Sequence, residues 1–149
     1  MKKLRKLFRI RPRDFGNIAR AYYYLARAGW RLFVRKETLT RWLVDPVEQP
    51  PLSEAQEAKL DEAATWANRA ARLPFPNARC LQRSLALCLW LEHEGYKPSL
   101  QVGARHDGTK LDAHAWVEYR GRVINDRDVV RSMFPRLTRP TAAAPSEHL

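Results

Sequence analysis

Both cysteines of the chain lie in one short stretch, NARCLQRSLALCLW, at residues 77–90. In a helix the eight-residue step from Cys80 to Cys88 is roughly 12 Å, too far for a disulfide. No CxxC or HxxxH spacing occurs in the sequence, so no metal site is expected. Two hypotheses remain. Either both cysteines are core residues, or one is a nucleophile and the other is a core residue.

The two cysteines differ in their predicted position along the helix. Asn77 is a favourable N-cap after the proline-containing loop PFPN, so a helix is expected over 78–94. Cys80 is then the third or fourth residue, where the helix dipole and free N–H groups stabilise a thiolate. Cys88 shares an apolar stripe with Leu85, and we expect it to be buried in the core.

A thiolate nucleophile needs a base and a group that orients the base. His114 lies in AHAWVE, within a predicted strand, and Asp126 follows in the next predicted strand. Strand side chains alternate between the two faces of a sheet. The length of the turn between the two strands therefore decides whether His114 and Asp126 share a face. A three-residue loop at 119–121 pairs Glu118 with Arg122 and His114 with Asp126, and it places glycine third, as this loop type favours. A two-residue turn would put Asp126 on the opposite face.

The order of the predicted elements indicates an α+β fold, because helices come first and strands later. A basic amphipathic helix is expected at about 15–36, and a Ser-x-x-Gln capping box at 53–56 begins an alanine-rich helix. Three antiparallel strands are expected in SLQVGAR, LDAHAWVEY and RGRVIND. The predicted organisation is a basic helical docking region at 1–44, a linker at 45–52, a working domain at 53–137 and a flexible tail at 138–149.

The excess positive charge is confined to the first quarter of the chain. Residues 1–42 contain 13 Lys and Arg against 2 Asp and Glu, which accounts for the whole net charge of +11. This asymmetry suggests a basic docking region attached to a neutral working domain. The docking candidates are Lys2, Lys3, Arg5, Lys6, Arg9, Arg20, Arg27 and Arg31.

The charge leaves several partners and functions open. A protein partner is the first hypothesis, and an anionic membrane surface is the second, since KKLRKLFRIR is basic and amphipathic. A nucleic-acid-binding module is a rival function, although no recognised binding motif accompanies the charge. No apolar run approaches the ~18 residues of a membrane span, and no signal peptide is evident, so a cytoplasmic location is expected.

The residues of two sequence motifs resemble those of a known family. CLQRSLAL followed by GARHDGTKLDAHAWVEYRGRVIND resembles the leader-peptide proteases of lasso-peptide biosynthesis, over about residues 50–130. These are small members of the papain-related, transglutaminase-like superfamily. The resemblance implies N-terminal helices and a catalytic helix packed on a small antiparallel sheet. It also implies that Cys80 is the nucleophile, His114 the general base and acid, and Asp126 the orienting residue.

The resemblance further implies a biological role without a cofactor. A cysteine protease of this kind removes the leader from a ribosomally made precursor peptide. A leader-recognition protein, the RiPP recognition element, presents the precursor, and a lasso cyclase then closes the ring. An inactive scaffold that keeps only the fold is a further alternative, against which the intact Cys80, His114 and Asp126 argue.

The oxyanion hole is the incomplete part of the predicted site. The backbone N–H of Cys80 should supply one donor. Papain-like enzymes add a glutamine six residues before the cysteine, where this chain has Pro74. Asn77 and Gln82 are the candidates for the second donor, and no spacing argument favours either of them.

Overall fold

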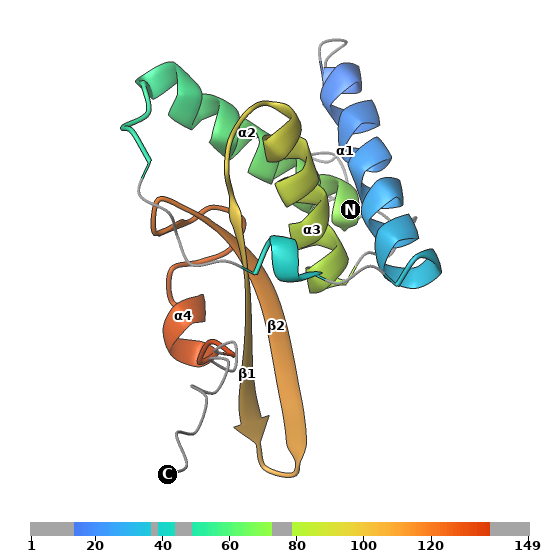
Figure 1. Cartoon of the computed structure of the whole chain (residues 1–149), viewed down its shortest axis with the longest axis vertical. Helices are drawn as coiled ribbons and strands as arrows, with labels where there is room; N and C mark the ends of the chain where they lie inside the picture. Colours follow the sequence, from blue (N-terminus) through green and yellow to red (C-terminus); the bar gives the residue numbers. More distant parts are fainter. Residues whose placement is uncertain (1–13, 37–38, 44–48, 73–78, 138–149) are drawn as a thin grey trace, which may run out of the picture.

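The computed structural model describes residues 14–36, 39–43, 49–72 and 79–137 (Figure 1). Its longer helices are α1 (Asp14–Gly29), α2 (Glu54–Ala71) and α3 (Cys80–His93). Shorter helical segments are η2 (Trp30–Val34), η3 (Leu39–Arg41) and α4 (Val130–Met133). The strands are β1 (Ser99–Asp107), β2 (Lys110–Tyr119) and β3 (Arg122–Val123), which form one antiparallel sheet in that order. The predicted α+β class is confirmed.

The main core lies between three helices and one face of the sheet. α3 packs against both other long helices and against β2. The predicted capping box at Ser53 and Gln56 is present and fixes the start of α2. α1 contributes Ala21, Tyr24, Leu25 and Ala28 to the same buried cluster as α2 and α3. No helix among the described residues is long and apolar enough to cross a membrane.

The two faces of β2 belong to different clusters. Ala115, Val117 and Tyr119 face the helices, and Trp116 packs on the other face with Val123, Val130 and Phe134. The first half of β2, residues 110–114, is exposed or half-buried, whereas residues 115–119 are buried. The β1–β2 hairpin therefore projects beyond the helices at its turn, as Figure 1 shows.

The predicted loop between β2 and β3 is wrong. The turn has two residues, Arg120 and Gly121, both with positive φ, and it pairs Tyr119 with Arg122 and Glu118 with Val123. Two successive positive φ angles match the twist of a tight hairpin, which explains why this turn replaces the three-residue loop. A regular continuation of this register would place Asp126 opposite Ala115, away from His114.

The chain leaves the sheet before this register reaches Asp126. β3 contains only two residues, although the backbone N–H of Ile124 still donates to Val117 O at 3.0 Å. The side-chain Oδ1 of Asn125, and no backbone carbonyl, accepts the N–H of Val117 at 2.8 Å. The alternation of faces consequently ends at Asn125, and Asp126 is free to turn back toward His114.

The segment after α4 closes the outer edge of β1. Arg136 forms a bridge to Gly103, Ala104 N–H donates to Pro135 O, and Leu137 N–H donates to Val102 O. A side chain at Gly103 would bring its Cβ to 2.5 Å from Phe134 O, so only glycine fits under this segment. The segment at 134–137 thus acts as a strap across β1.

Candidate active site

The first turn of α3 carries the candidate nucleophile. Cys80 is the first residue of α3, whereas the third or fourth position was predicted. Arg79 is the N-cap of this helix, and its side chain makes no capping bond. Asn77, the predicted cap and oxyanion candidate, lies outside the described residues. The first helical bond here runs from Arg83 N–H to Arg79 O at 3.0 Å. The N–H of Cys80 therefore has no acceptor within the helix and can serve as an anion donor.

The imidazole and the carboxylate of the predicted site are in contact. His114 Nε2 lies 2.7 Å from Asp126 Oδ2, although the two side chains are only partly buried. The other carboxylate oxygen accepts the N–H of Arg127 at 2.8 Å. With Nε2 directed at the carboxylate, Nδ1 is the ring nitrogen left to exchange a proton with a thiol.

The ionised form of Asp126 is favoured in the folded protein. Partial burial raises the pKa of Asp126, but the bonds from His114 and Arg127 and the charge of Arg83 act against it. The resulting pKa lies below the usual 3.8. The Arg83 guanidinium is 3.8 Å from Asp126 Oδ2, so α3 itself contributes a charge to the site.

A buried polar network fixes the position of Asp126 relative to α3. Asn125 Nδ2 donates to Ser84 Oγ at 2.9 Å, and Ser84 Oγ donates to Ala115 O at 3.0 Å. Asn68 of α2 donates to Asn125 O at 3.0 Å. Ser84 and Asn125 are both almost fully buried. The network joins two helices, β2 and the bend after β3 at one point.

Cys80 lies on the face of α3 that this network uses. Residues three and four positions apart share a helix face, so Cys80 lies one turn before Arg83 and Ser84. Cys80 is half-buried and packs against the edge of the main core. Among the described contacts no hydrogen bond joins its Sγ to His114. The structure thus pairs His114 with Asp126 and places Cys80 one helical turn from the residues that hold Asp126.

Aromatic rings cover the candidate base. The His114 ring lies 5.1 Å from the Phe134 ring and 6.5 Å from the Trp116 ring, centroid to centroid. The Arg105 guanidinium lies over the Phe134 ring at 4.7 Å. Phe134 belongs to the strap, so the strap limits the rotation of the imidazole.

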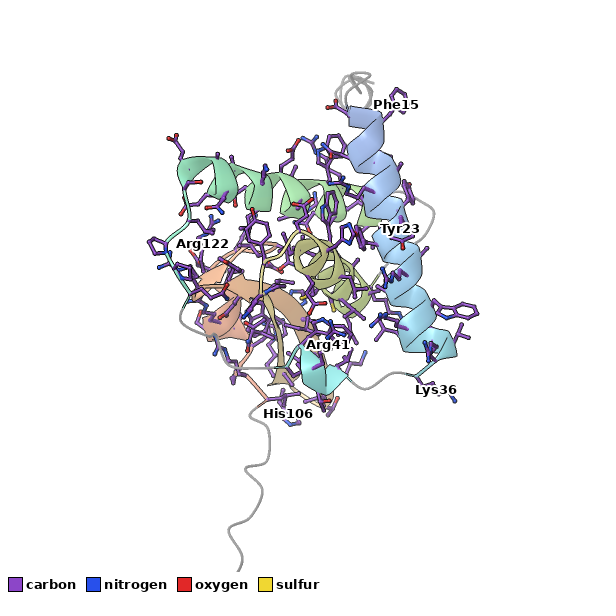
Figure 2. All side chains as sticks on the ribbon, turned by 45° about the horizontal axis from the view of Figure 1, so that its top comes forward. Phe15, Tyr23, Lys36, Arg41, His106 and Arg122 are labelled. Atoms are coloured by element: carbon purple, nitrogen blue, oxygen red, sulfur yellow. The ribbon has the colours of Figure 1, made fainter. Side chains whose placement is uncertain are left out.

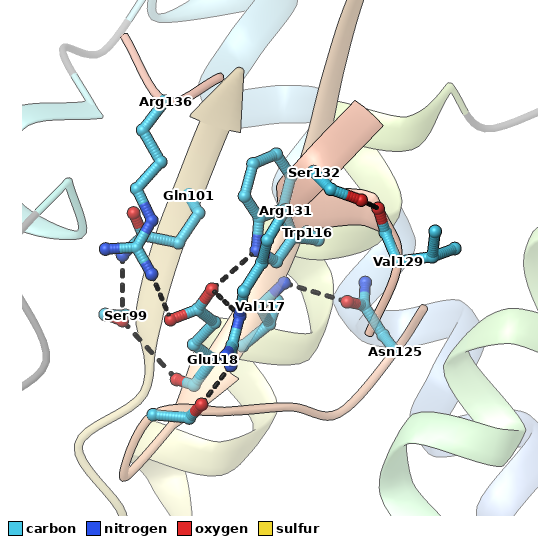
Figure 3. Close-up of polar contacts among 11 residues, drawn as sticks. Ser99, Gln101, Trp116, Val117, Glu118, Asn125, Val129, Arg131, Ser132 and Arg136 are labelled. Atoms are coloured by element: carbon cyan, nitrogen blue, oxygen red, sulfur yellow. Dashed lines mark hydrogen bonds and ion pairs between the residues drawn. The ribbon is translucent and has the colours of Figure 1, made fainter. Parts of the chain in front are cut away.

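A buried carboxylate holds the strap in place (Figure 3). The side chain of Glu118 is fully buried and accepts three bonds on its two oxygens. Trp116 Nε1 donates at 2.8 Å, Arg131 Nε at 3.0 Å and Arg136 at 2.6 Å. A buried carboxylate requires such compensation, because its loss of hydration is otherwise costly. The three donors connect α4 and the strap to β2.

Sequence reasoning did not identify several residues that shape this site. Arg83, Asn125 and Phe134 were not assigned a role. Glu118 was predicted to lie opposite Arg122, but it pairs with Val123 and its carboxylate bonds Arg131 and Arg136. Nor was a role assigned to Ser84, which lies beside the apolar stripe of Leu85 and Cys88 in its helix. The one sequence signal was a polar residue within that stripe, since a buried serine needs a partner.

The other predicted residues have structural partners elsewhere. Gln82 does not face the site, because its Nε2 donates to Leu25 O at 2.9 Å and ties α3 to α1. Cys88 is fully buried, and burial raises the pKa of its thiol far above the usual value of 9.0. It is a core residue.

The docking candidates that the structure describes all have intramolecular contacts. Arg20 bonds Glu94 at 2.8 Å, and the guanidinium groups of Arg27 and Arg31 lie over the rings of Tyr23 and Trp42. The remaining candidates, Lys2, Lys3, Arg5, Lys6 and Arg9, lie outside the described residues.

Comparison with protein families agrees with this arrangement. The core domain of the transglutaminase-like superfamily matches residues 22–139, which is most of the chain. The chain belongs to the transglutaminase-like superfamily. Its members are typically cysteine hydrolases. No curated protein and no solved structure matches the chain significantly. The match begins within α1, in keeping with the shared core of α1, α2 and α3.

The Asn125 network predicts a specific loss of stability. Asn125→Ala leaves the N–H of Val117 and the hydroxyl of Ser84 with fewer partners, so the free energy of unfolding should fall by about 1–3 kcal/mol. Urea unfolding followed by circular dichroism measures this difference. Asn17→Ala is the matched control, because its amide bonds Glu62 at the surface, and its effect should stay within about 0.5 kcal/mol. Equal effects of the two variants would contradict the role of the network.

The lowered pKa of Asp126 predicts a pH-dependent contribution to stability. Since the folded protein favours the carboxylate, this contribution is complete above the unfolded pKa and is lost as pH falls through the folded pKa. Wild type should therefore exceed Asp126→Asn in unfolding free energy at about pH 6, and the difference should shrink below about pH 4. Unfolding curves of both proteins at several pH values test this. A difference that grows on acidification would refute it.

Proposed function

We propose that the protein is a cysteine peptidase that removes the leader from a ribosomally made lasso-peptide precursor. The observation that carries the proposal is the contact of His114 Nε2 with Asp126 beside the helix that begins at Cys80. Acyl transfer through a thioester requires a thiol nucleophile and an imidazole base that a third group orients. Superfamily membership supports the chemistry. The lasso-peptide substrate rests on the resemblance of the motifs around Cys80 and His114.

The reaction follows from the roles of three side chains. The Cys80 thiol gives its proton to His114 Nδ1, and the sulfur attacks the carbonyl of the last leader residue. The N–H of Cys80 bonds the resulting oxyanion. His114 then protonates the amine of the core peptide as the C–N bond breaks, which leaves a thioester. Water loses a proton to His114 and hydrolyses the thioester, and Asp126 keeps the imidazole oriented throughout.

The proposal predicts that the two cysteines differ in function. Cys80→Ala should reduce leader cleavage at least about a thousandfold, because the nucleophile is lost. Cys88→Ala should retain cleavage and lose only stability, because Cys88 is a buried core residue. The measurement is cleavage of the precursor in the presence of the leader-recognition protein, followed by mass spectrometry. Full activity of the Cys80 variant would overturn the proposal.

We further propose that the basic N-terminal region docks the leader-recognition protein. Large apolar side chains accompany the basic residues along α1 and η2 and are exposed. Figure 2 shows Phe15 and Tyr23 along α1, with Lys36 beyond its far end. Trp30, Phe33 and Val34 continue this exposed set. Exposed aromatic residues beside positive charge are typical of a protein-docking surface with an acidic partner.

Docking predicts a salt-dependent loss of affinity. Deletion of residues 1–13 removes seven basic residues, so binding to the leader-recognition protein should weaken about tenfold or more at low ionic strength. The loss should be smaller at high salt, because screening already weakens the same charges. Calorimetry at two salt concentrations measures both values. Unchanged affinity would exclude this docking mode, and binding only to anionic vesicles would favour a membrane surface.

A further inference from the structure

The guanidinium of Arg83 lies at the candidate active site without a hydrogen-bonding partner. Its Nε is fully buried and bonds no acceptor among the described residues. Its contact with Asp126 Oδ2, at 3.8 Å, is an ion pair too long to be a hydrogen bond. Only 17% of the Arg83 side chain is exposed. Buried donors are normally bonded, so the described part of the fold does not account for this one.

Arg83 is an unfavourable choice for stability alone. A guanidinium has five N–H donors, and a buried donor without an acceptor lowers the stability of the folded state. A long ion pair with a partly exposed carboxylate compensates little of this loss. Stability alone would favour an uncharged side chain of similar length. The buried guanidinium therefore indicates a role in the function of the site.

The side chain of Arg83 is directed toward the turn that carries the thiol. Arg83 follows Cys80 by three residues, so the two residues share a face of α3. Side chains on an α-helix lean toward its N-terminus, which places the guanidinium over the turn that begins at Cys80. The carboxylate oxygen of Asp126 beside this guanidinium also bonds His114 Nε2, at 2.7 Å. The guanidinium and the imidazole thus meet at the first turn of α3.

The proposed reaction needs a second donor at this place. Attack of a thiolate on a carbonyl gives an oxyanion, which preorganised N–H donors stabilise. The N–H of Cys80, which has no acceptor within the helix, is one such donor. Gln82 bonds Leu25 in α1, and Asn77 lies outside the described residues. Neither candidate from the sequence is therefore placed at the thiol as the second donor.

We propose that the guanidinium of Arg83 is the second oxyanion donor, beside the N–H of Cys80. This inference rests on the proposed peptidase function and adds a catalytic residue to it. A guanidinium forms charge-assisted hydrogen bonds, which are about twice as strong as neutral ones. The long contact with Asp126 orients the group and leaves its outer N–H donors available for the oxyanion.

Two reactions of Cys80 distinguish an oxyanion donor from a residue that only activates the thiol. Iodoacetamide alkylates the thiolate by displacing iodide from a saturated carbon, and no oxyanion forms. The thiolate attacks p-nitrophenyl acetate at its carbonyl carbon. The resulting oxyanion re-forms the carbonyl as the C–O bond breaks, which releases p-nitrophenolate and leaves an acetyl thioester. The ratio of the acylation rate to the alkylation rate therefore reports oxyanion stabilisation.

The proposal predicts a selective effect of Arg83→Met. The ratio should fall about tenfold or more, because one oxyanion donor is lost. The alkylation rate should stay close to that of wild type, because His114 and Asp126 still form the base. The urea midpoint of unfolding should not fall, because the removed Nε has no acceptor among the described residues. Mass spectrometry assigns both reactions to Cys80, and the buried Cys88 is the internal unreactive thiol.

Two further variants control for charge. Arg122→Met removes the arginine of a surface ion pair with Asp61, at 3.0 Å, and should leave the ratio unchanged. Arg83→Lys should lose less than Arg83→Met, because an ammonium still donates hydrogen bonds. If Arg83→Met does not fold, Arg83→Gln replaces it, since its polar end is too short to occupy the place of the guanidinium.

Three results would contradict the proposal, each in a recognisable way. An unchanged ratio in Arg83→Met would show that the guanidinium does not stabilise the oxyanion. Equal losses of alkylation and acylation would assign Arg83 to activation of the thiol, and the oxyanion role would be wrong. A wild-type Cys80 that is alkylated but never acylated would refute the proposed acyl transfer itself, and the role of Arg83 with it.

Discussion

The hydrogen bond from Val117 N–H to the side chain of Asn125 is the constraint on which the site depends. In a regular strand a backbone carbonyl would fill this place. Because Asn125 fills it with its side chain, the main chain is released from the sheet and turns toward His114. The same amide bonds Ser84 of the helix that carries Cys80. One buried side chain thereby sets the positions of the Asp126 carboxylate and of α3 together.

A second polar anchor acts on the opposite face of β2. Glu118 is fully buried and binds Arg131 and Arg136, which hold the strap over β1. The strap brings Phe134 onto the His114 ring and uses the missing side chain of Gly103 to approach β1. The two anchors have different consequences. Asn125 directs the carboxylate to the imidazole, and Glu118 limits the movement of the imidazole. Both bury polar groups that the fold must fully satisfy.

Local signals in the sequence determined the α+β class, the capping box of α2 and the buried state of Cys88. Periodicity and helix caps act within a few residues, so they can be read without tertiary contacts. The contact of His114 with Asp126 was also predicted, but the loop and the strand register on which that prediction relied are both wrong. Only the tertiary structure decided how it forms, because Asn125 bonds β2 and α3, which are remote in sequence. The contacts of Gln82 with α1 and of Phe134 with His114 were decided in the same way, since no local pattern encodes packing between distant segments.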